Sequence, residues 1–120
     1  SEKRTDGRAP LLGSITIFKE TGVFWARGSC LDLSESGAGG LIGKIAINKG
    51  DTVVVEFSSP SSVATFSAKC VVQRLRTSDQ SADQMRIGFK FVNLTSLTKK
   101  RIAEYIKDVR SKSFGDQNTF

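Results

Sequence analysis

Residues 23–37 read Val-Phe-Trp-Ala-Arg-Gly-Ser-Cys-Leu-Asp-Leu-Ser-Glu-Ser-Gly. In a β-strand, successive side chains point to opposite faces. One face of this strand would carry, in order, Phe24, Ala26, Gly28, Cys30, Asp32 and Ser34. A row of small or apolar residues therefore ends in a carboxylate and a hydroxyl, and both groups form hydrogen bonds. Because Gly37 follows as a turn residue, the pattern predicts either a polar ligand site at the rim of a small barrel or an ordinary strand end closed by a turn.

Five further stretches have the alternation of a strand. They are residues 11–20, 41–47, 53–57, 63–76 and 85–91. Asn48-Lys49-Gly50-Asp51 between two of them is typical of a hairpin turn. After residue 94 the period changes to that of a helix with one apolar stripe, formed by Ile102, Tyr105, Ile106 and Val109. The sequence therefore predicts a mainly β protein, with a small six-stranded antiparallel β-barrel (or a sandwich) followed by a C-terminal α-helix.

The length of 120 residues suits a single domain. We expect that domain to span residues 1–112, with a flexible arm at 1–10, the barrel at 11–94 and the helix at 95–112. Thr95 or Ser96 would cap the helix. Residues 113–120 would form a frayed tail.

The composition limits the possible functions. The chain has 18 basic and 12 acidic residues and no histidine. Without histidine or clustered carboxylates there is no evident general acid–base pair, so we expect no enzyme activity and no metal or cofactor. The isolated Cys30 and Cys70 fit free buried thiols and a cytoplasmic, reducing location. No apolar run reaches the roughly 20 residues of a membrane span.

Basic residues occur at two other informative places. The inner row of the strand at 63–76 would be Ala64, Phe66, Ala68, Cys70 and Val72, and its next member is Arg74. Arg74 would then either reach the rim near Asp32 and Ser34 or be solvated. Arg4 and Arg8 lie in the polar N-terminal segment directly after Lys3. They could form a clamp for an anion or belong to a charged tail.

Together these clusters resemble the PilZ domain family of bacterial cyclic di-GMP receptors over about residues 3–110. Arg4 and Arg8 match its Arg-x-x-x-Arg motif. Asp32, Ser34 and Gly37 match its Asp/Asn-x-Ser-x-x-Gly motif. The segment Ile87-Gly88-Phe89-Lys90-Phe91 matches the glycine-centred element that precedes the family's closing helix.

The resemblance implies a receptor that couples binding of cyclic di-GMP to a conformational change and to the regulation of an unknown protein partner. Arg4 and Arg8 would hold phosphates and guanine O6/N7 edges. Asp32 would accept hydrogen bonds from guanine, Ser34 would bond a phosphate or base edge, and Gly37 would let the backbone approach. The further candidates for ligand contact are Lys3, Ser36 and Arg74, and Lys3 could reach a phosphate of a second, intercalated ligand molecule.

Two other functions compete with this one. A basic small barrel could bind single-stranded nucleic acid, but that function needs exposed aromatic residues, and here the aromatic residues fall mostly on inward rows. An interaction module without a ligand could instead dock a partner on the basic helix.

Overall fold

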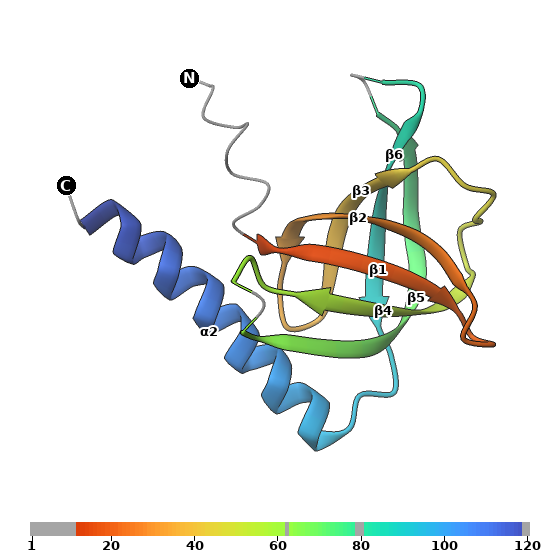
Figure 1. Ribbon diagram of the computed structural model, residues 1–120. Helices are drawn as coiled ribbons and strands as arrows, with labels where there is room; N and C mark the ends of the chain where they lie inside the picture. Colours follow the sequence, from red (N-terminus) through yellow and green to blue (C-terminus); the bar gives the residue numbers. More distant parts are fainter. Residues whose placement is uncertain (1–11, 62, 79–80, 119–120) are drawn as a thin grey trace.

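The computed structural model describes residues 12–61, 63–78 and 81–118, with side chains up to Arg110. Within these residues the chain forms six antiparallel strands and a C-terminal helix (Figure 1). The elements are β1 (Ser14–Lys19), β2 (Phe24–Leu33), β3 (Gly37–Gly43), β4 (Thr52–Ser58), β5 (Thr65–Thr77), β6 (Gln84–Phe91) and α2 (Ser96–Asn118). The strands close into a barrel in the order β1-β2-β3-β6-β5-β4. The expected six-stranded barrel with a terminal helix is confirmed, and the sandwich is not.

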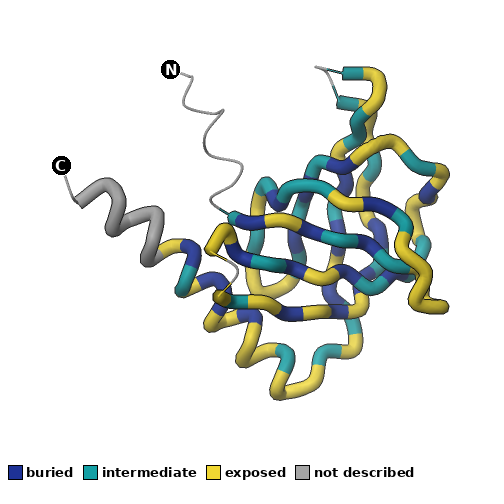
Figure 2. The backbone as a smooth tube through the Cα atoms, in the orientation of Figure 1, coloured by how far each residue is buried: buried dark blue, intermediate teal, exposed yellow. Residues whose placement is uncertain are grey.

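Alternate residues of every strand point into the barrel and form one apolar core (Figure 2). Its aromatic centre is Phe57 on β4, which stacks on Phe66 of β5 with ring centroids 4.4 Å apart. Tyr105 of α2 meets the edge of Phe66 at 5.1 Å and has no exposed surface. The helix is thus held against the barrel by an aromatic contact with the core.

The first residue of α2 lies where the sequence predicts it, whereas the last residue does not. The Thr98 amide donates a hydrogen bond to the Thr95 hydroxyl at 3.1 Å, so Thr95 is the cap. The expected apolar stripe is buried. The helix then continues to Asn118, past residue 112, where we expected it to end. The extension contains no proline, and the lone Gly115 does not interrupt a helix that is already propagating.

The connection between β3 and β4 also differs from the expectation. Residues 48–51 do form a turn, in which the Asp51 amide donates to the Asn48 carbonyl at 3.0 Å and Gly50 has φ 96°. The turn does not join a hairpin, because β3 pairs with β2 and β6 while β4 pairs with β1 and β5. Local turn chemistry is visible in the sequence, but strand adjacency is a property of the whole barrel.

Candidate functional site

A β-bulge in β2 decides where Asp32 points. Cys30 pairs with Gly40, and Asp32 pairs with the next residue, Gly39, so Leu31 is an extra residue in the ladder. An extra residue shifts the alternation of faces by one. Asp32 therefore lies exposed on the outside of the barrel, not on the inner row of Cys30 as strict alternation predicts. The predicted continuity between the core row and Asp32 is wrong.

A second bulge acts in the same way on β5. Val72 pairs with Phe89 and Arg74 with Gly88, which leaves Gln73 unpaired. Arg74 is consequently exposed on the outer face instead of continuing the inner row. Two bulges on different strands thus turn a carboxylate and a guanidinium outward on the same wall of the barrel.

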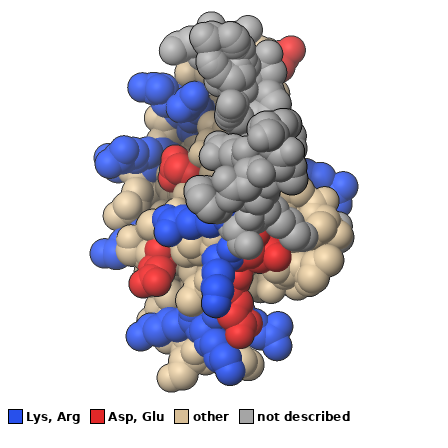
Figure 3. Space-filling view, turned by 90° about the vertical axis from the view of Figure 1, so that its left-hand side faces the viewer, with Lys and Arg blue, Asp and Glu red and all other residues tan. Residues whose placement is uncertain are grey.

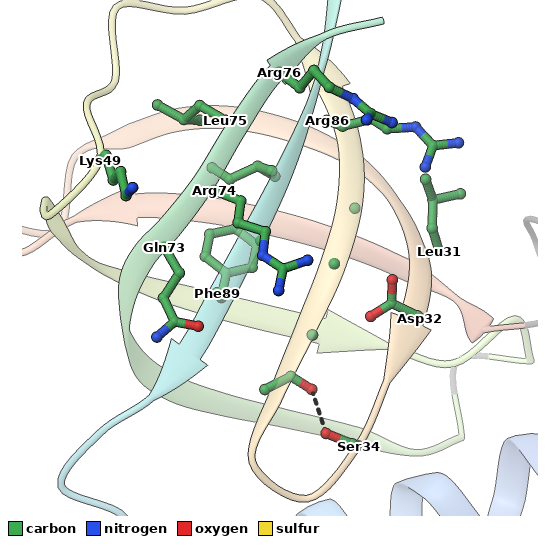
Figure 4. A pocket seen from close by; sticks show the side chains of 16 residues that line it. Leu31, Asp32, Ser34, Lys49, Gln73, Arg74, Leu75, Arg76, Arg86 and Phe89 are labelled. Atoms are coloured by element: carbon green, nitrogen blue, oxygen red, sulfur yellow. Dashed lines mark hydrogen bonds between the residues drawn. The ribbon is translucent and has the colours of Figure 1, made fainter.

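Asp32 and Arg74 face one another across two glycines. Gly39 on β3 pairs with Gly88 on β6, so one row across four neighbouring strands reads Asp32, Gly39, Gly88, Arg74. The carboxylate and the guanidinium point toward each other over β3 and β6 (Figure 4). The row lies in a groove of about 800 Å³, which is also lined by Ser34 and Gly37. The structure therefore brings Asp32, Ser34, Gly37 and Arg74 together. Of the two alternatives that the sequence left open for Arg74, this is the one in which it lies near Asp32 and Ser34.

The glycines of this groove serve different purposes. A Cβ on Gly37 would collide with the Phe89 backbone carbonyl, so β3 and β6 can approach there only without a side chain. The atoms nearest to a Cβ on Gly39 would be those of the Asp32 carboxylate, from 2.7 Å, and the atoms nearest to a Cβ on Gly88 would be those of the Arg74 side chain, from 3.3 Å. Backbone packing requires glycine at Gly37. At Gly39 and Gly88, the lack of a side chain leaves an open floor between Asp32 and Arg74.

Ser34 and Ser36 shape the turn between β2 and β3. The Ser34 hydroxyl donates to the Gly37 carbonyl at 3.3 Å and accepts from the Ser36 amide at 3.3 Å. The Ser36 carbonyl accepts from the Phe91 amide at 3.0 Å, which ties the turn to β6. Ser34 lines the groove but Ser36 does not, so the structure does not place Ser36 among the groove residues.

The groove contains cations that the sequence analysis did not single out. They are Lys49, Arg76 and Arg86. The alternation of Arg86 with Gly88 and Lys90 already predicts an outward Arg86. Arg86 lies opposite Arg76 because of the bulge at Gln73 and the β5–β6 register. No local sequence pattern predicts either feature.

Lys3, Arg4 and Arg8 lie outside the described residues. The described chain starts at Leu12, whose carbonyl accepts a hydrogen bond from the Tyr105 hydroxyl at 2.9 Å. Gly13 follows with φ 93°, and a Cβ there would collide with the Tyr105 hydroxyl and the Ser58 carbonyl. The segment that follows the Arg-x-x-x-Arg motif is therefore fastened to α2.

The surroundings of the two thiols make them unreactive. Cys30 and Cys70 are free and buried, and burial raises the pKa of each thiol to about 12. Their predicted role as small core residues is confirmed. Within the described ranges, no group of three or more His, Cys, Asp or Glu side chains could hold a metal ion.

The basic residues of α2 give no comparable site. Residues Lys99, Lys100, Arg101, Lys107 and Arg110 share the helix with Glu104 and Asp108. On the face shown in Figure 3, basic and acidic side chains are interspersed. Among the described residues, no helix has both the length and the apolar character that a membrane span requires.

Comparison with known families identifies the family of the chain. Residues 2–108 match the family model of the PilZ domain. The chain belongs to the PilZ domain family. The match covers both the N-terminal arginine motif and the groove residues, and no curated protein matches the sequence.

Two solved structures share the PilZ fold. The PilZ domain of YcgR from Escherichia coli, solved with c-di-GMP, has a TM-score of 0.66 and 15% identity, with 90% of this chain and 89% of that chain covered. MrkH from K. pneumonia in its apo state has a TM-score of 0.66 and 13% identity, and covers 87% of this chain. This PilZ chain spans 49% of the MrkH chain. At these identities the likeness concerns the fold.

Proposed function

We propose that this PilZ chain is a non-enzymatic receptor for cyclic di-GMP. The observation that carries the proposal is the outward row in which Asp32 and Arg74 face each other across the open Gly39–Gly88 floor. A guanine base offers N–H donors on one edge and the O6 and N7 acceptors on another. A carboxylate and a guanidinium on opposite sides of a side-chain-free floor are complementary to those two edges. The c-di-GMP complex of the YcgR PilZ domain supports the same ligand for this chain.

The residues divide the work of binding. Asp32 accepts from guanine N–H groups, and Ser34 offers its hydroxyl to a phosphate or base edge while holding the turn. Gly37 keeps β3 close to β6 and so sets the shape of the floor. Arg4 and Arg8 supply the cations for the phosphates, with Lys3 and Ser36 as further candidates. The buried, unpaired Cys30 and Cys70 fit a protein that works in the cytoplasm.

Binding of single-stranded nucleic acid is less well supported. That function relies on exposed aromatic side chains on which bases stack. Among the described residues, Phe57, Phe66, Phe89, Phe91 and Tyr105 are buried, and the exposed Phe24 does not line the groove.

Titration calorimetry with cyclic di-GMP, with GTP as the control ligand, tests the proposal. Saturable binding of cyclic di-GMP at low-micromolar or better affinity is expected, and GTP should bind far more weakly. At a hundredfold excess over the dissociation constant the ligand should also raise the free energy of unfolding by about 2.7 kcal/mol. The absence of both binding heat and a thermal shift at ~100 μM ligand would refute the receptor function.

Signalling requires that binding change the protein. We propose that contacts of Arg4 and Arg8 with the ligand draw residues 1–10 onto the groove, and that this change reaches a protein partner through α2. The Tyr105–Leu12 hydrogen bond joins the base of that segment to the helix. Ligand should therefore slow trypsin cleavage at Lys3, Arg4 and Arg8 while leaving cleavage at Lys107 and Arg110 unchanged. Equal cleavage rates with and without saturating ligand would contradict this coupling.

A further inference from the structure

A third β-bulge, in the β1–β2 ladder, turns an aromatic side chain outward. Ile17 of β1 pairs with Ala26 of β2, and the next residue of β1 pairs with Phe24, so Trp25 is an extra residue. The Trp25 ring lies 5.0 Å from the Lys19 ammonium. Ala26 is buried in the core, whereas Phe24 is 55% exposed. Because the bulge shifts the alternation of faces by one, the prediction that Phe24 shares the inner row of Ala26 is wrong.

Phe24 belongs to an apolar row that crosses three strands on the outside of the barrel. Phe18 of β1 pairs with Phe24 on one side and with Val54 of β4 on the other. The Phe18 and Phe24 rings meet edge to face, with their centroids 6.4 Å apart. Val23, which precedes Phe24, is 56% exposed. Contiguous exposed apolar side chains, unlike scattered single ones, mark sites of interaction.

The next outward row carries two opposite charges, one on each side of β1. Thr16 of β1 pairs with Arg27 of β2 and with Glu56 of β4. Both charged side chains are exposed, and neither forms an ion pair with another described residue. Lys69, which pairs with Val54 at the end of the apolar row, already has an ion-pair partner in Glu20 at 3.6 Å. The free charges of the two rows are therefore one cation and one anion.

The two rows are complementary to themselves under a two-fold rotation. In the barrel β1 lies between β2 and β4 (Figure 1). When two copies pack face to face about an axis along β1, β2 of each copy lies against β4 of the other. Arg27 then meets Glu56 of the partner subunit, and Phe24 meets the partner's Val54. The same rotation brings Phe18 against its own copy, as in other isologous contacts.

We propose that the outer face of β2, β1 and β4 is the interface of a homodimer of this chain. This proposal goes beyond the receptor function and does not depend on it. In the closed strand order β1 lies three strands from β6 in either direction, so the groove stays open in the dimer. Three strands about 5 Å apart make a contact smaller than the roughly 800 Å² per partner of a standard interface. We therefore expect a reversible dimer that dissociates on dilution.

Sedimentation equilibrium with charge-swapped variants tests the interface. The wild type should pass from monomer to dimer between about 10 μM and about 1 mM protein. Arg27→Glu alone and Glu56→Arg alone each place like charges opposite one another, which should raise the dissociation constant at least about tenfold. An equimolar mixture of these two variants should dimerise as the wild type does, because both contacts then join opposite charges. Recovery in the mixture also shows that both variants fold.

The matched control is Lys90→Glu, which makes the same change of charge as Arg27→Glu at an exposed position of β6, on the opposite wall. It should dimerise like the wild type, whereas Phe24→Ser should remain a monomer. A wild type that is monomeric at about 1 mM, or a mixture that stays monomeric while the wild type dimerises, would overturn the interface. Dimerisation of a wild type that does not bind cyclic di-GMP would support the interface and overturn only the receptor function.

Discussion

The strand β4 and the wall that holds the groove are built in different ways. β4 pairs with β1 over residues 14–19 and with β5 over residues 65–71 without a break in register. The β2–β3 and β5–β6 ladders each contain a one-residue bulge, at Leu31 and Gln73. The unbroken part buries Val53, Val55 and Phe57 completely, whereas the bulged wall exposes Asp32 and the arginines. Both parts contribute to the core, since the bulged ladders also bury Cys30 and Val72, but irregular pairing in the bulged wall places polar groups where a ligand can reach them.

We expect substitution of Phe57 to have the largest effect on stability. This ring stacks on Phe66 and meets the edges of Phe91 and Tyr105 at 6.0 and 6.3 Å. Phe57→Ala should lower the free energy of unfolding by about 3–5 kcal/mol, because it leaves a cavity in a fully buried site. Urea denaturation measures the loss, and the outward neighbour Glu56→Ala is the control, with a change within about 0.5 kcal/mol. A loss below about 1 kcal/mol would place the main stabilisation elsewhere.

Two glycine substitutions separate the contribution of backbone packing from that of the open floor within the groove. Gly37→Ala should destabilise the protein by about 1–3 kcal/mol, because the new methyl group would collide with the Phe89 carbonyl on β6. Gly88→Ala should cost less stability than Gly37→Ala, because the atoms nearest to its methyl group are those of the Arg74 side chain, with Cβ at 3.3 Å, and not a backbone carbonyl, yet it should weaken cyclic di-GMP binding by raising the floor. Thermal melts and titrations of both variants check this pair. Equal stability of the two variants would show that the backbone contact at Gly37 does not matter.

How far the sequence predicts this molecule depends on the regularity of the ladder. Alternation assigns the faces of β4 correctly, and the 3.6-residue period identifies the buried stripe of α2. Alternation fails past Leu31 and Gln73, because neither residue differs in type from an ordinary strand residue and the bulge arises from the pairing of distant strands. The motif in the sequence therefore predicts that Asp32 contacts a ligand, but strict alternation assigns Asp32 to the wrong face. The Gly39–Gly88 pair and the Arg76–Arg86 pair depend on register alone, so spacing in the sequence does not reveal them.

A smaller effect on stability, one that depends on pH, comes from the buried thiols of Cys30 and Cys70 and from the Tyr105 hydroxyl. Burial raises the pKa of Cys30 and Cys70 to about 12 and also raises the pKa of Tyr105. These groups keep their protons in the folded state, whereas the unfolded chain loses the thiol protons above about pH 9 and the tyrosine proton above about pH 10, so the unfolded state is favoured as pH rises. The stability should hold below pH 9 and fall between pH 9 and 12, by about 1 kcal/mol per thiol at pH 10. Urea titrations from pH 7 to 10.5 measure the slope, and a flat profile would mean that the thiols are not desolvated.

A calorimetric comparison of Asp32→Ala with Glu35→Ala distinguishes recognition of cyclic di-GMP by the bulged wall from binding to a merely basic surface. Both side chains are exposed, they lie three residues apart, and both substitutions remove one negative charge, but only Asp32 lines the groove. Loss of a hydrogen bond involving a charged group costs about 1.5–3 kcal/mol, so Asp32→Ala should weaken binding roughly ten- to a hundredfold. Glu35→Ala should bind as the wild type does. Recognition would rest on charge alone if the two variants bind equally well, or if Asp32→Ala binds more tightly because the groove has become more positive. Either result would contradict specific recognition of cyclic di-GMP by the bulged wall.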